Sequence, residues 1–285
     1  MTKLRDDFCV FILSYGRPND VKTLETLQKA GYSGQYFIVV SDDDGEVDNY
    51  KKKFGSKVCV FNKLEQAKYF DIMDNRKEAT ASIIYARNYC FKLAQNLGYR
   101  YFLELDDDYH AFSYRYAEDD KLKAKPVKDI DAIFELTLQL LDDTDALTVA
   151  YSQGGDLIGG LNGSNFKKGL LRKAMNSFFI DTHKPFQFLG RINEDVNMYV
   201  DNGAKGKKIF QVTNISIDQE QTQSHSTGMT ELYLDYGTYA KSFYSVMIQP
   251  SFVKLSKMGT ANPRIHHQVD WRHGVPKIIN PKYKK

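Results

Sequence analysis

Apolar runs alternate with amphipathic stretches along the first half of the chain, and polar residues follow each run. The apolar runs occupy residues 8–13, 36–40, 58–61 and 101–105. Runs of this kind are typical of strands buried on both faces of a parallel sheet. The intervening residues 20–30 and 80–97 have apolar side chains at helical spacing, followed by Gly31 and Gly98 as stop signals. This alternation predicts an α/β fold with a mostly parallel central sheet flanked by helices.

The run at residues 101–105 leads into three consecutive carboxylates, Asp106, Asp107 and Asp108. Adjacent anions repel one another unless positive charge lies among them. Divalent Mg²⁺ and Mn²⁺ prefer carboxylate oxygens, and ligands of open α/β sheets bind at the carboxyl ends of the strands. We therefore expect Asp106 and Asp108 to bind a divalent cation. The alternative is a solvated acidic turn.

Two earlier runs deliver polar residues to the same predicted sheet edge. Ser14-Tyr15-Gly16-Arg17 follows the first run, and Asp42-Asp43-Asp44 follows the second. Arg87 and Asn88 lie within the predicted helix 80–97. These two side chains either face a nucleotide pocket or belong to a solvated helix face.

The second half of the chain has fewer clear signals. Residues 129–141 have the pattern of a helix and 146–150 that of a strand, and the glycine-rich residues 152–163 form either a mobile loop near a ligand or a plain flexible insertion. The polar residues 215–229 predict a long loop outside the core, and 233–246 a helix rich in aromatic residues.

Charged residues of the second half offer further candidates. Glu194 and Asp195 open a predicted short helix, either as favourable first-turn anions or as a general base, with Asn193 near the cap. The late histidines His225, His266, His267 and His273 are each more often surface or hydrogen-bonded residues than metal ligands. The basic residues form one cluster at Lys167, Lys168, Arg172 and Lys173, and another at Lys205, Lys207 and Lys208.

Composition limits the class of protein without naming a partner. The 285 residues carry a formal net charge of +3, which neither requires nor excludes a nucleic-acid partner. The three cysteines stand in apolar runs without metal-ligand spacing, so we expect reduced thiols. The sequence has no apolar signal core near its start and no run of about 18 apolar residues. We expect a cytoplasmic protein without membrane partners.

Together these segments resemble the GT-A glycosyltransferases, in particular family 2-like members. The resemblance rests on Tyr15-Gly16-Arg17-Pro18, Asp42-Asp43-Asp44, Ala86-Arg87-Asn88, Leu105-Asp106-Asp107-Asp108 and Asn193-Glu194-Asp195. The glycine-rich segment, Thr227-Gly228-Met229-Thr230 and the tail from His266-His267 to Trp271 resemble more narrowly the TET-associated glycosyltransferases of bacteriophages. The Asp-Asp-Asp in place of a plain Asp-x-Asp departs from the usual pattern. The sequence has no obvious Gln-x-x-Arg-Trp motif, which argues against a processive polysaccharide synthase.

The resemblance implies a role for each candidate residue. It implies a UDP-sugar donor bound by Ser14, Tyr15, Arg17, Asp42, Asp43, Arg87, Asn88, Asp106 and Asp107. It implies Mn²⁺ or Mg²⁺ at Asp106 and Asp108, with His225 or His267 completing the site. Asp195, or else Glu194, would be the catalytic base. The acceptor would be a 5-hydroxymethyl-pyrimidine in phage DNA, placing the protein in the host cytoplasm, with Lys167, Lys168, Arg172 and Lys173 as DNA contacts.

Three other functions remain open at this stage. The same chemistry could act on a glycan or a small molecule, the chain could be a nucleotidyltransferase, or it could be a DNA-binding module without catalysis. The last would leave the acidic residues unexplained. We expect a catalytic domain at residues 1–215, with a nucleotide-binding half (1–110) and an acceptor half (111–215). Residues 216–285 would form an extension packing on the active site.

Overall fold

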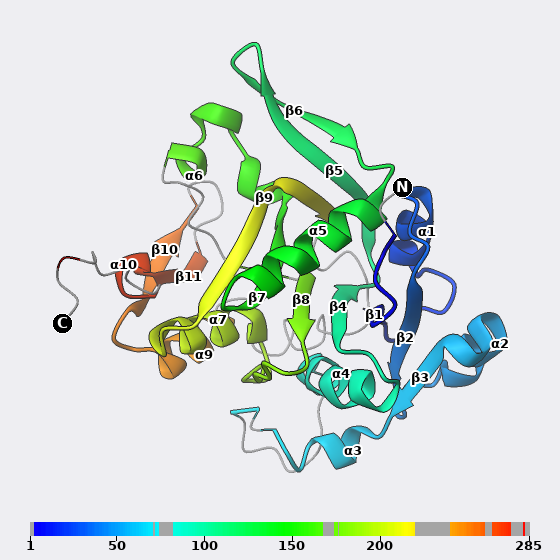
Figure 1. Ribbon diagram of the computed structural model, residues 1–285. Coiled ribbons are helices and arrows are strands. Elements are labelled where there is room, and N and C mark those ends of the chain that lie inside the picture. Colours follow the sequence, from blue (N-terminus) through cyan, green and yellow to red (C-terminus); the bar gives the residue numbers. More distant parts are fainter. Residues whose placement is uncertain are drawn as a thin grey trace.

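The computed structural model describes residues 3–70, 72–73, 82–167, 174–175, 177–219, 240–259, 264–274 and 282. Within these ranges the chain builds one nine-stranded sheet, with helices on both sides, and one two-stranded sheet (Figure 1). The large sheet has the strand order β3-β2-β1-β4-β8-β7-β9-β5-β6. The predicted α/β class with a central sheet flanked by helices is confirmed.

The strands and helices follow the predicted alternation through the first half. In chain order the strands are β1 (Phe8–Leu13), β2 (Gln35–Ser41), β3 (Val58–Phe61), β4 (Tyr101–Asp106), β5 (Tyr109–Glu118), β6 (Lys121–Pro126), β7 (Ala146–Gln153), β8 (Ser177–Asp181), β9 (Lys208–Gln219), β10 (Val253–Met258) and β11 (Arg264–Val269). The α-helices are α1 (Lys22–Lys29), α2 (Val47–Phe54), α3 (Lys63–Gln66), α4 (Ile84–Asn96), α5 (Ile130–Asp143), α6 (Ser164–Lys167), α7 (Glu194–Ala204), α9 (Ala240–Ile248) and α10 (Trp271–Gly274). Short 3₁₀ turns occupy Gly55–Lys57, Gly154–Leu157 and Gly160–Asn162.

Most strands of the large sheet point in one direction. The pairs β3–β2, β2–β1, β1–β4 and β7–β9 are parallel. The pairs β4–β8, β8–β7, β9–β5 and β5–β6 are antiparallel. Only β8 and β5 therefore oppose the other seven strands of the described sheet. The ends of β1, β2, β3 and β4 consequently meet at one edge, as the sequence predicts.

Two apolar layers cover the sheet. On strand β1, alternate side chains enter different layers: Phe8, Val10 and Ile12 enter one, and Cys9, Phe11 and Leu13 the other. Helices α1, α2 and α5 contribute to the first layer, and α4 and α7 to the second. Because both faces of β1 are buried, its continuous apolar sequence is explained.

The C-terminal unit, defined here as α9, β10, β11 and α10, lies beside α7 (Figure 1). Ser245 of α9 bonds to Asn197 near the start of α7. The ring of Trp271 stacks on Tyr199 with 5.5 Å between ring centroids. At the end of α7, a Cβ on Gly203 would lie 2.2 Å from the carbonyl oxygen of Gly274. The unit thus contacts α7 along its length.

Several expectations for the second half need correction. Residues 215–219 belong to strand β9 rather than a loop, and Ile215 and Ile217 are core residues. The other residues of that predicted loop, 220–229, lie outside the described residues. Helix α9 begins at Ala240, and the earlier part of the predicted aromatic helix also lies outside them. The β5–β6 hairpin, which projects from the top of the view in Figure 1, and strand β8 were not predicted.

Candidate active site

A buried arginine joins three elements beneath the acidic residues at the end of β4. Arg87 on α4 is 1% exposed, and its guanidinium donates to Asp106 (3.0 Å), Glu194 (3.2 Å) and Glu104 (3.5 Å). Its charged carbon also lies 5.5 Å from the ring centroids of Phe178 and Phe188. We call Arg87, Glu104, Asp106 and Glu194 the arginine cluster. The idea of a solvated helix face is wrong for Arg87.

The arginine cluster contains more acid than base. Burial raises the pKa of Glu104 to about 8 and that of Glu194 to about 7, although Arg87 opposes both shifts. Burial also raises the pKa of Asp106, and the nearby charge of Asp195 adds to this shift. The same three carboxylates outweigh the effect of burial on Arg87 and raise its pKa. One guanidinium does not offset the burial of these acids, so the carboxyl groups of Glu104 and Glu194 keep their protons to a higher pH than exposed glutamates do.

Asp107 connects the ends of β1 and β4. Its carboxylate is 1% exposed and accepts from Ser14 Oγ at 2.5 Å and from Arg17 Nη2 at 2.6 Å. Tyr50 of α2 supports both partners, because its hydroxyl lies 2.6 Å from Ser14 Oγ and accepts from the Arg17 backbone N–H at 2.8 Å. Three predicted donor-binding residues, Ser14, Arg17 and Asp107, therefore lie together. Tyr15 between them is 39% exposed at this edge.

The acidic turn after β2 connects the same edge to β3. Asp42 accepts from the Lys63 backbone N–H at 2.9 Å, and Asp43 pairs with the Lys63 ammonium at 2.6 Å. Asp44, which is 5% exposed, accepts from the backbone N–H of Gly16 at 2.6 Å. The turn thus brings the ends of β1, β2 and β3 together, with Asp42 and Asp43 on its exposed side.

Asp108 and Asp195 complete the acidic set. Asp108 lies in the turn between β4 and β5, beside Asp107. Asp195 is 6% exposed at the start of α7, where its Oδ1 accepts from the backbone N–H of Val196 at 2.7 Å. Its charge affects both Asp106 and Glu194. The carboxylates at the C-terminal end of β4 and those at the start of α7 therefore interact electrostatically with one another. We call this group of carboxylates the acidic edge.

Asn88 has a different place from the one expected. Its amide nitrogen donates to the Phe188 carbonyl at 3.0 Å, and its amide oxygen accepts from the Phe188 N–H at 2.9 Å. With 5% exposure, the side chain anchors the chain that leads toward α7. We correct the expectation that Asn88 faces the nucleotide, because this backbone pairing accounts for its position.

Other predicted residues divide between the described and undescribed parts of the chain. His267 on β11 is 7% exposed, and its Nδ1 lies 3.4 Å from the amide nitrogen of Asn193. Lys167 is exposed at the end of α6. The remaining predicted contacts, His225, Lys168, Arg172 and Lys173, lie outside the described residues.

Sequence reasoning missed Glu104, although a signal was present. Glu104 is the charged residue within the otherwise apolar start of β4, and it is fully buried. A carboxylate at such a position is rarely buried unless it is paired, so its sequence context called for a cationic partner. Tyr50 gave no comparable signal, because an aromatic residue on an amphipathic helix is ordinarily a core residue.

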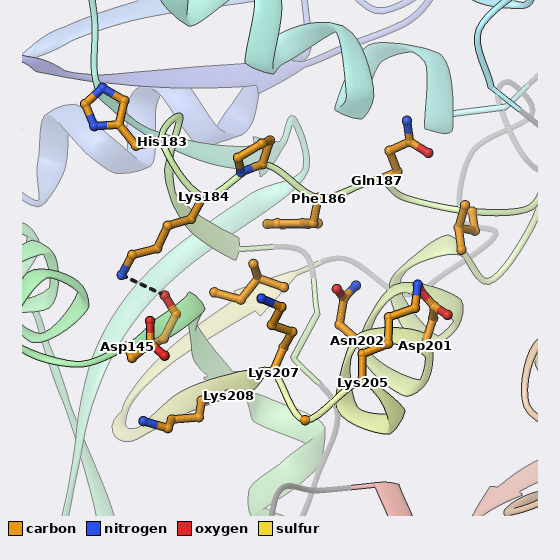
Figure 2. Close-up of a pocket in the computed structure, with 15 residues that line it drawn as sticks. Asp145, His183, Lys184, Phe186, Gln187, Asp201, Asn202, Lys205, Lys207 and Lys208 are labelled. Carbon is orange, nitrogen blue, oxygen red and sulfur yellow. Dashed lines mark hydrogen bonds and ion pairs between the residues drawn. The ribbon is translucent and has the colours of Figure 1, made fainter.

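A cavity of about 650 Å³ lies away from the acidic edge (Figure 2). Its lining includes the first residues of β7 and β9 and the last turn of α7, with Lys184, Lys205, Lys207 and Lys208 around it. Because β7 and β9 run in the same direction as β4, their first residues mark the edge opposite Asp106. This basic cavity is therefore separate from the candidate active site.

Comparisons with solved structures give only weak likenesses. Glucosyl-3-phosphoglycerate synthase from Mycobacterium tuberculosis, in complex with Mn²⁺, UDP and phosphoglyceric acid, is 11% identical, with a TM-score of 0.46 over 93% of this chain and 87% of that one. S. aureus TarS 1–349 in complex with UDP-GlcNAc is 12% identical, with a TM-score of 0.47 over 85% and 66%. Mannosyltransferase PcManGT from Pyrobaculum calidifontis, in complex with GDP-Man and Mn²⁺, is 10% identical, with a TM-score of 0.44 over 77% and 59%. No curated protein matches.

The comparison with protein families is decisive. The sequence model of the TET-Associated Glycosyltransferase family matches residues 8–228, which include the acidic edge and all nine strands of the large sheet. This match confirms the resemblance to the glycosyltransferases that the sequence predicts, and with it an enzymatic function. The chain therefore belongs to the TET-associated glycosyltransferase family.

Proposed function

We propose that this glycosyltransferase moves a sugar from a UDP-sugar to the hydroxyl of a 5-hydroxymethyl-pyrimidine in DNA. The observation that supports the donor site best is the pairing of Asp107 with Ser14 and Arg17. It brings the ends of β1 and β4 together beside the exposed acidic turn after β2. Ligands of open α/β sheets bind at such converging strand ends.

The residues at the acidic edge fit a divalent cation. No group of three His, Cys, Asp or Glu side chains in the described ranges is arranged to hold a metal. Mg²⁺ usually binds one or two carboxylates together with water and substrate phosphates, so a full protein cage is not needed. We assign the cation to Asp108 and to Asp106, whose side chain keeps 22% exposure beside Arg87. A bound cation would supply Lewis-acid stabilisation of the departing diphosphate.

Asp195 is the better candidate for the general base. Glu194 is less suited to this role, because its Oε1 accepts a hydrogen bond from the buried Arg87. Asp195 accepts a hydrogen bond from the backbone N–H of Val196, and its charge acts on Asp106. A carboxylate here could remove the proton from the acceptor hydroxyl while the leaving group remains on the Asp106 side. We therefore assign Glu194 to the support of Arg87 and Asp195 to proton removal.

The proposed DNA acceptor rests on family membership rather than on a visible DNA surface. The family is named for an association with TET, and the sequence resemblance implies acceptors that are hydroxymethylated pyrimidines. An enzyme that modifies a base of duplex DNA must usually remove that base from the stack. Lys167 and its undescribed basic neighbours remain the proposed backbone contacts. Family membership also removes the nucleotidyltransferase and the non-catalytic DNA-binding module as leading alternatives.

One assay of nucleoside diphosphate release can test both the donor and the acceptor of this proposal. Purified protein is incubated with individual nucleotide sugars and Mn²⁺, and release of nucleoside diphosphate is measured with and without hydroxymethylated DNA. We expect DNA-stimulated release from a UDP-sugar that disappears with chelator. Asp108→Asn should abolish it while the thermal unfolding curve stays close to wild type.

A matched variant controls for the loss of one surface charge. Asp120→Asn changes a carboxylate in the β5–β6 turn, far along the hairpin from Asp108, and should leave the activity unchanged. Full Mn²⁺-dependent turnover by Asp108→Asn would remove this residue from the metal site. Release of pyrophosphate in place of nucleoside diphosphate would contradict sugar transfer.

A further inference from the structure

A buried hydrogen-bond network connects the C-terminal unit to the start of α7. Asn193, directly before Glu194 and Asp195, donates from its amide nitrogen to Ser245 Oγ at 2.6 Å. Ser245 Oγ donates to Asn197 Oδ1 at 2.8 Å, and both Ser245 and Asn197 have 0% exposure. The amide nitrogen of Asn193 also lies 3.4 Å from Nδ1 of His267. Residues from α7, α9 and β11 therefore share one network.

The direction of these hydrogen bonds follows from the number of available protons. Asn197 uses its amide nitrogen to donate to the carbonyls of Leu189 (2.8 Å) and Ile192 (3.2 Å), so its oxygen must accept from Ser245. A hydroxyl has one proton, and Ser245 Oγ therefore accepts from Asn193. The second amide proton of Asn193 is then directed at His267 Nδ1, and the neutral imidazole carries its proton on Nε2.

The backbone around the network is held in an unusual shape. Asn193 has a φ of 63°, in the left-handed region, which asparagine adopts more readily than most residues that carry a side chain. Gly190 has a φ of 81°, and a Cβ there would lie 2.7 Å from Asn197 Nδ2 and 3.3 Å from the ring of Tyr244 on α9. The backbone thus turns into α7 between contacts from α7 itself and from α9. A left-handed residue at this point needs surrounding contacts to persist.

We infer that Ser245 and His267 are positioning residues that orient Asp195 through Asn193 and Asn197. This inference rests on the proposed function, in which Asp195 is the base. Ser245 and His267 stand beyond residue 228, where the family match ends, so the C-terminal unit adds a support that the matched region does not contain. In this arrangement His267 acts through Asn193, and it is not the late ligand of the metal.

The structure offers a matched pair of serines for the test. Ser242 and Ser245 both lie on α9 with 0% exposure, but within the described part of the chain the hydroxyl of Ser242 has no hydrogen-bond partner. Ser245→Ala removes the link between Asn193 and Asn197, whereas Ser242→Ala removes a hydroxyl of equal burial. Because a small misplacement of a catalytic group can cost about 10²-fold, we expect kcat of Ser245→Ala to fall by about 10–100-fold. The KM for the nucleotide sugar should stay within about 2-fold, and Ser242→Ala should match wild type.

Asn193→Gly and His267→Gln extend the test. Glycine adopts a positive φ without strain, so Asn193→Gly removes the side-chain bonds while keeping the backbone turn accessible. Asn193→Gly should lower kcat as Ser245→Ala does. The double variant with Asn193→Gly and Ser245→Ala should have a kcat only slightly lower than that of either single variant. His267→Gln should lower kcat without changing the affinity for Mn²⁺ alone, measured by titration calorimetry. A metal ligand would instead lose Mn²⁺ affinity.

The outcomes separate this inference from the proposed function. If wild type transfers no sugar from any donor, the proposed function fails. If wild type is active and the folded Ser245→Ala and Asn193→Gly variants keep their kcat within 2-fold, the positioning role is refuted. Equal losses in Ser242→Ala and Ser245→Ala would also refute it, because packing alone would then explain the effect. Weakened Mn²⁺ binding by His267→Gln would return this histidine to the metal site.

Discussion

Replacing Arg87 by methionine should destabilise the protein more than any surface charge change. The side chain is 1% exposed and bonds to Asp106, Glu104 and Glu194, while its guanidinium packs beside two phenylalanine rings. Methionine occupies much of the same volume, so the change removes the charge without opening a large cavity. The variant therefore leaves the buried Glu104 and Glu194 and the partly exposed Asp106 without their common cation.

The expected loss can be bounded from the contacts. Hydrogen bonds to charged groups contribute about 1.5–3 kcal/mol each, so three would suggest a loss of about 4.5–9 kcal/mol. Protonation of the uncompensated acids limits that loss, since burial already raises the pKa of Glu104 to about 8. We therefore expect about 3–5 kcal/mol, the usual cost of breaking a buried ion pair. With an m value of about 3 kcal/mol per molar urea, the midpoint should fall by about 1–1.7 M.

The pH dependence follows from the direction of the pKa shifts. Arg87 lowers the pKa of Glu104 and of Glu194, so its removal raises both folded-state values further. Carboxylates whose folded pKa is raised bind more protons in the folded than in the unfolded chain, and their stability contribution falls as the pH rises. The difference in unfolding free energy between wild type and variant should therefore stay nearly constant below about pH 6 and grow as the pH rises through 7 and 8, where the wild-type acids lose protons that the variant still holds.

Urea unfolding followed by circular dichroism, with chelator present, measures this difference. Adding Glu104→Gln to Arg87→Met should recover about 0.5–3 kcal/mol, because one uncompensated acid is removed. Arg272→Met is the control, since Arg272 pairs with Asp270 while 84% exposed, and exposed ion pairs contribute little to stability. A loss below about 1 kcal/mol for Arg87→Met, or no recovery in the double variant, would refute the reasoning.

Three further predictions concern the base, the C-terminal unit and DNA. Asp195→Asn should lower kcat by about 10²–10⁴-fold with the donor KM nearly unchanged in steady-state assays, whereas lost donor affinity at normal kcat would make it a nucleotide contact. Gly203→Ala should cost about 1–3 kcal/mol in thermal unfolding, because its Cβ would lie 2.2 Å from the Gly274 carbonyl oxygen. The control Gly45→Ala, which meets nothing within 4 Å, should be neutral, and equal effects would argue against the α7–α10 contact. Changing Lys167, Lys168, Arg172 and Lys173 together to glutamine should reduce the slope of log affinity against log salt by up to about 3.6 in DNA titrations, and an unchanged slope would point to a small acceptor.

The first half of the fold and its acidic edge were predictable because local pattern and sheet geometry agree. Each buried strand is a short apolar run, and parallel strands must deliver their following residues to one edge. That argument places Ser14, Asp42 and Asp106 together without any knowledge of tertiary contacts. It cannot predict which of the three aspartates at the end of β4 pairs with which arginine. The structure distinguishes them, since Asp107 pairs with Arg17 and Asp106 with Arg87.

The second half was less predictable because tertiary pairing overrides its polar composition. The segment around Ile215 and Ile217 is mostly polar, yet it is held as strand β9 between β7 and β5. The partnership of Glu194 with Arg87 joins residues that are 107 positions apart, which no local pattern reveals. The same holds for Ser245, whose importance becomes visible only when α9 is placed against α7.

The most direct test of the central claim is nucleoside mass spectrometry of modified DNA. DNA containing 5-hydroxymethylcytosine or 5-hydroxymethyluracil is incubated with the protein, Mn²⁺ and a panel of nucleotide sugars, then digested to nucleosides. We predict a nucleoside heavier by one sugar residue with one of the donors, absent for unmodified DNA and for Asp108→Asn. Unchanged hydroxymethylated nucleosides with every donor, while the protein transfers sugar to a glycan or small molecule, would contradict the DNA acceptor.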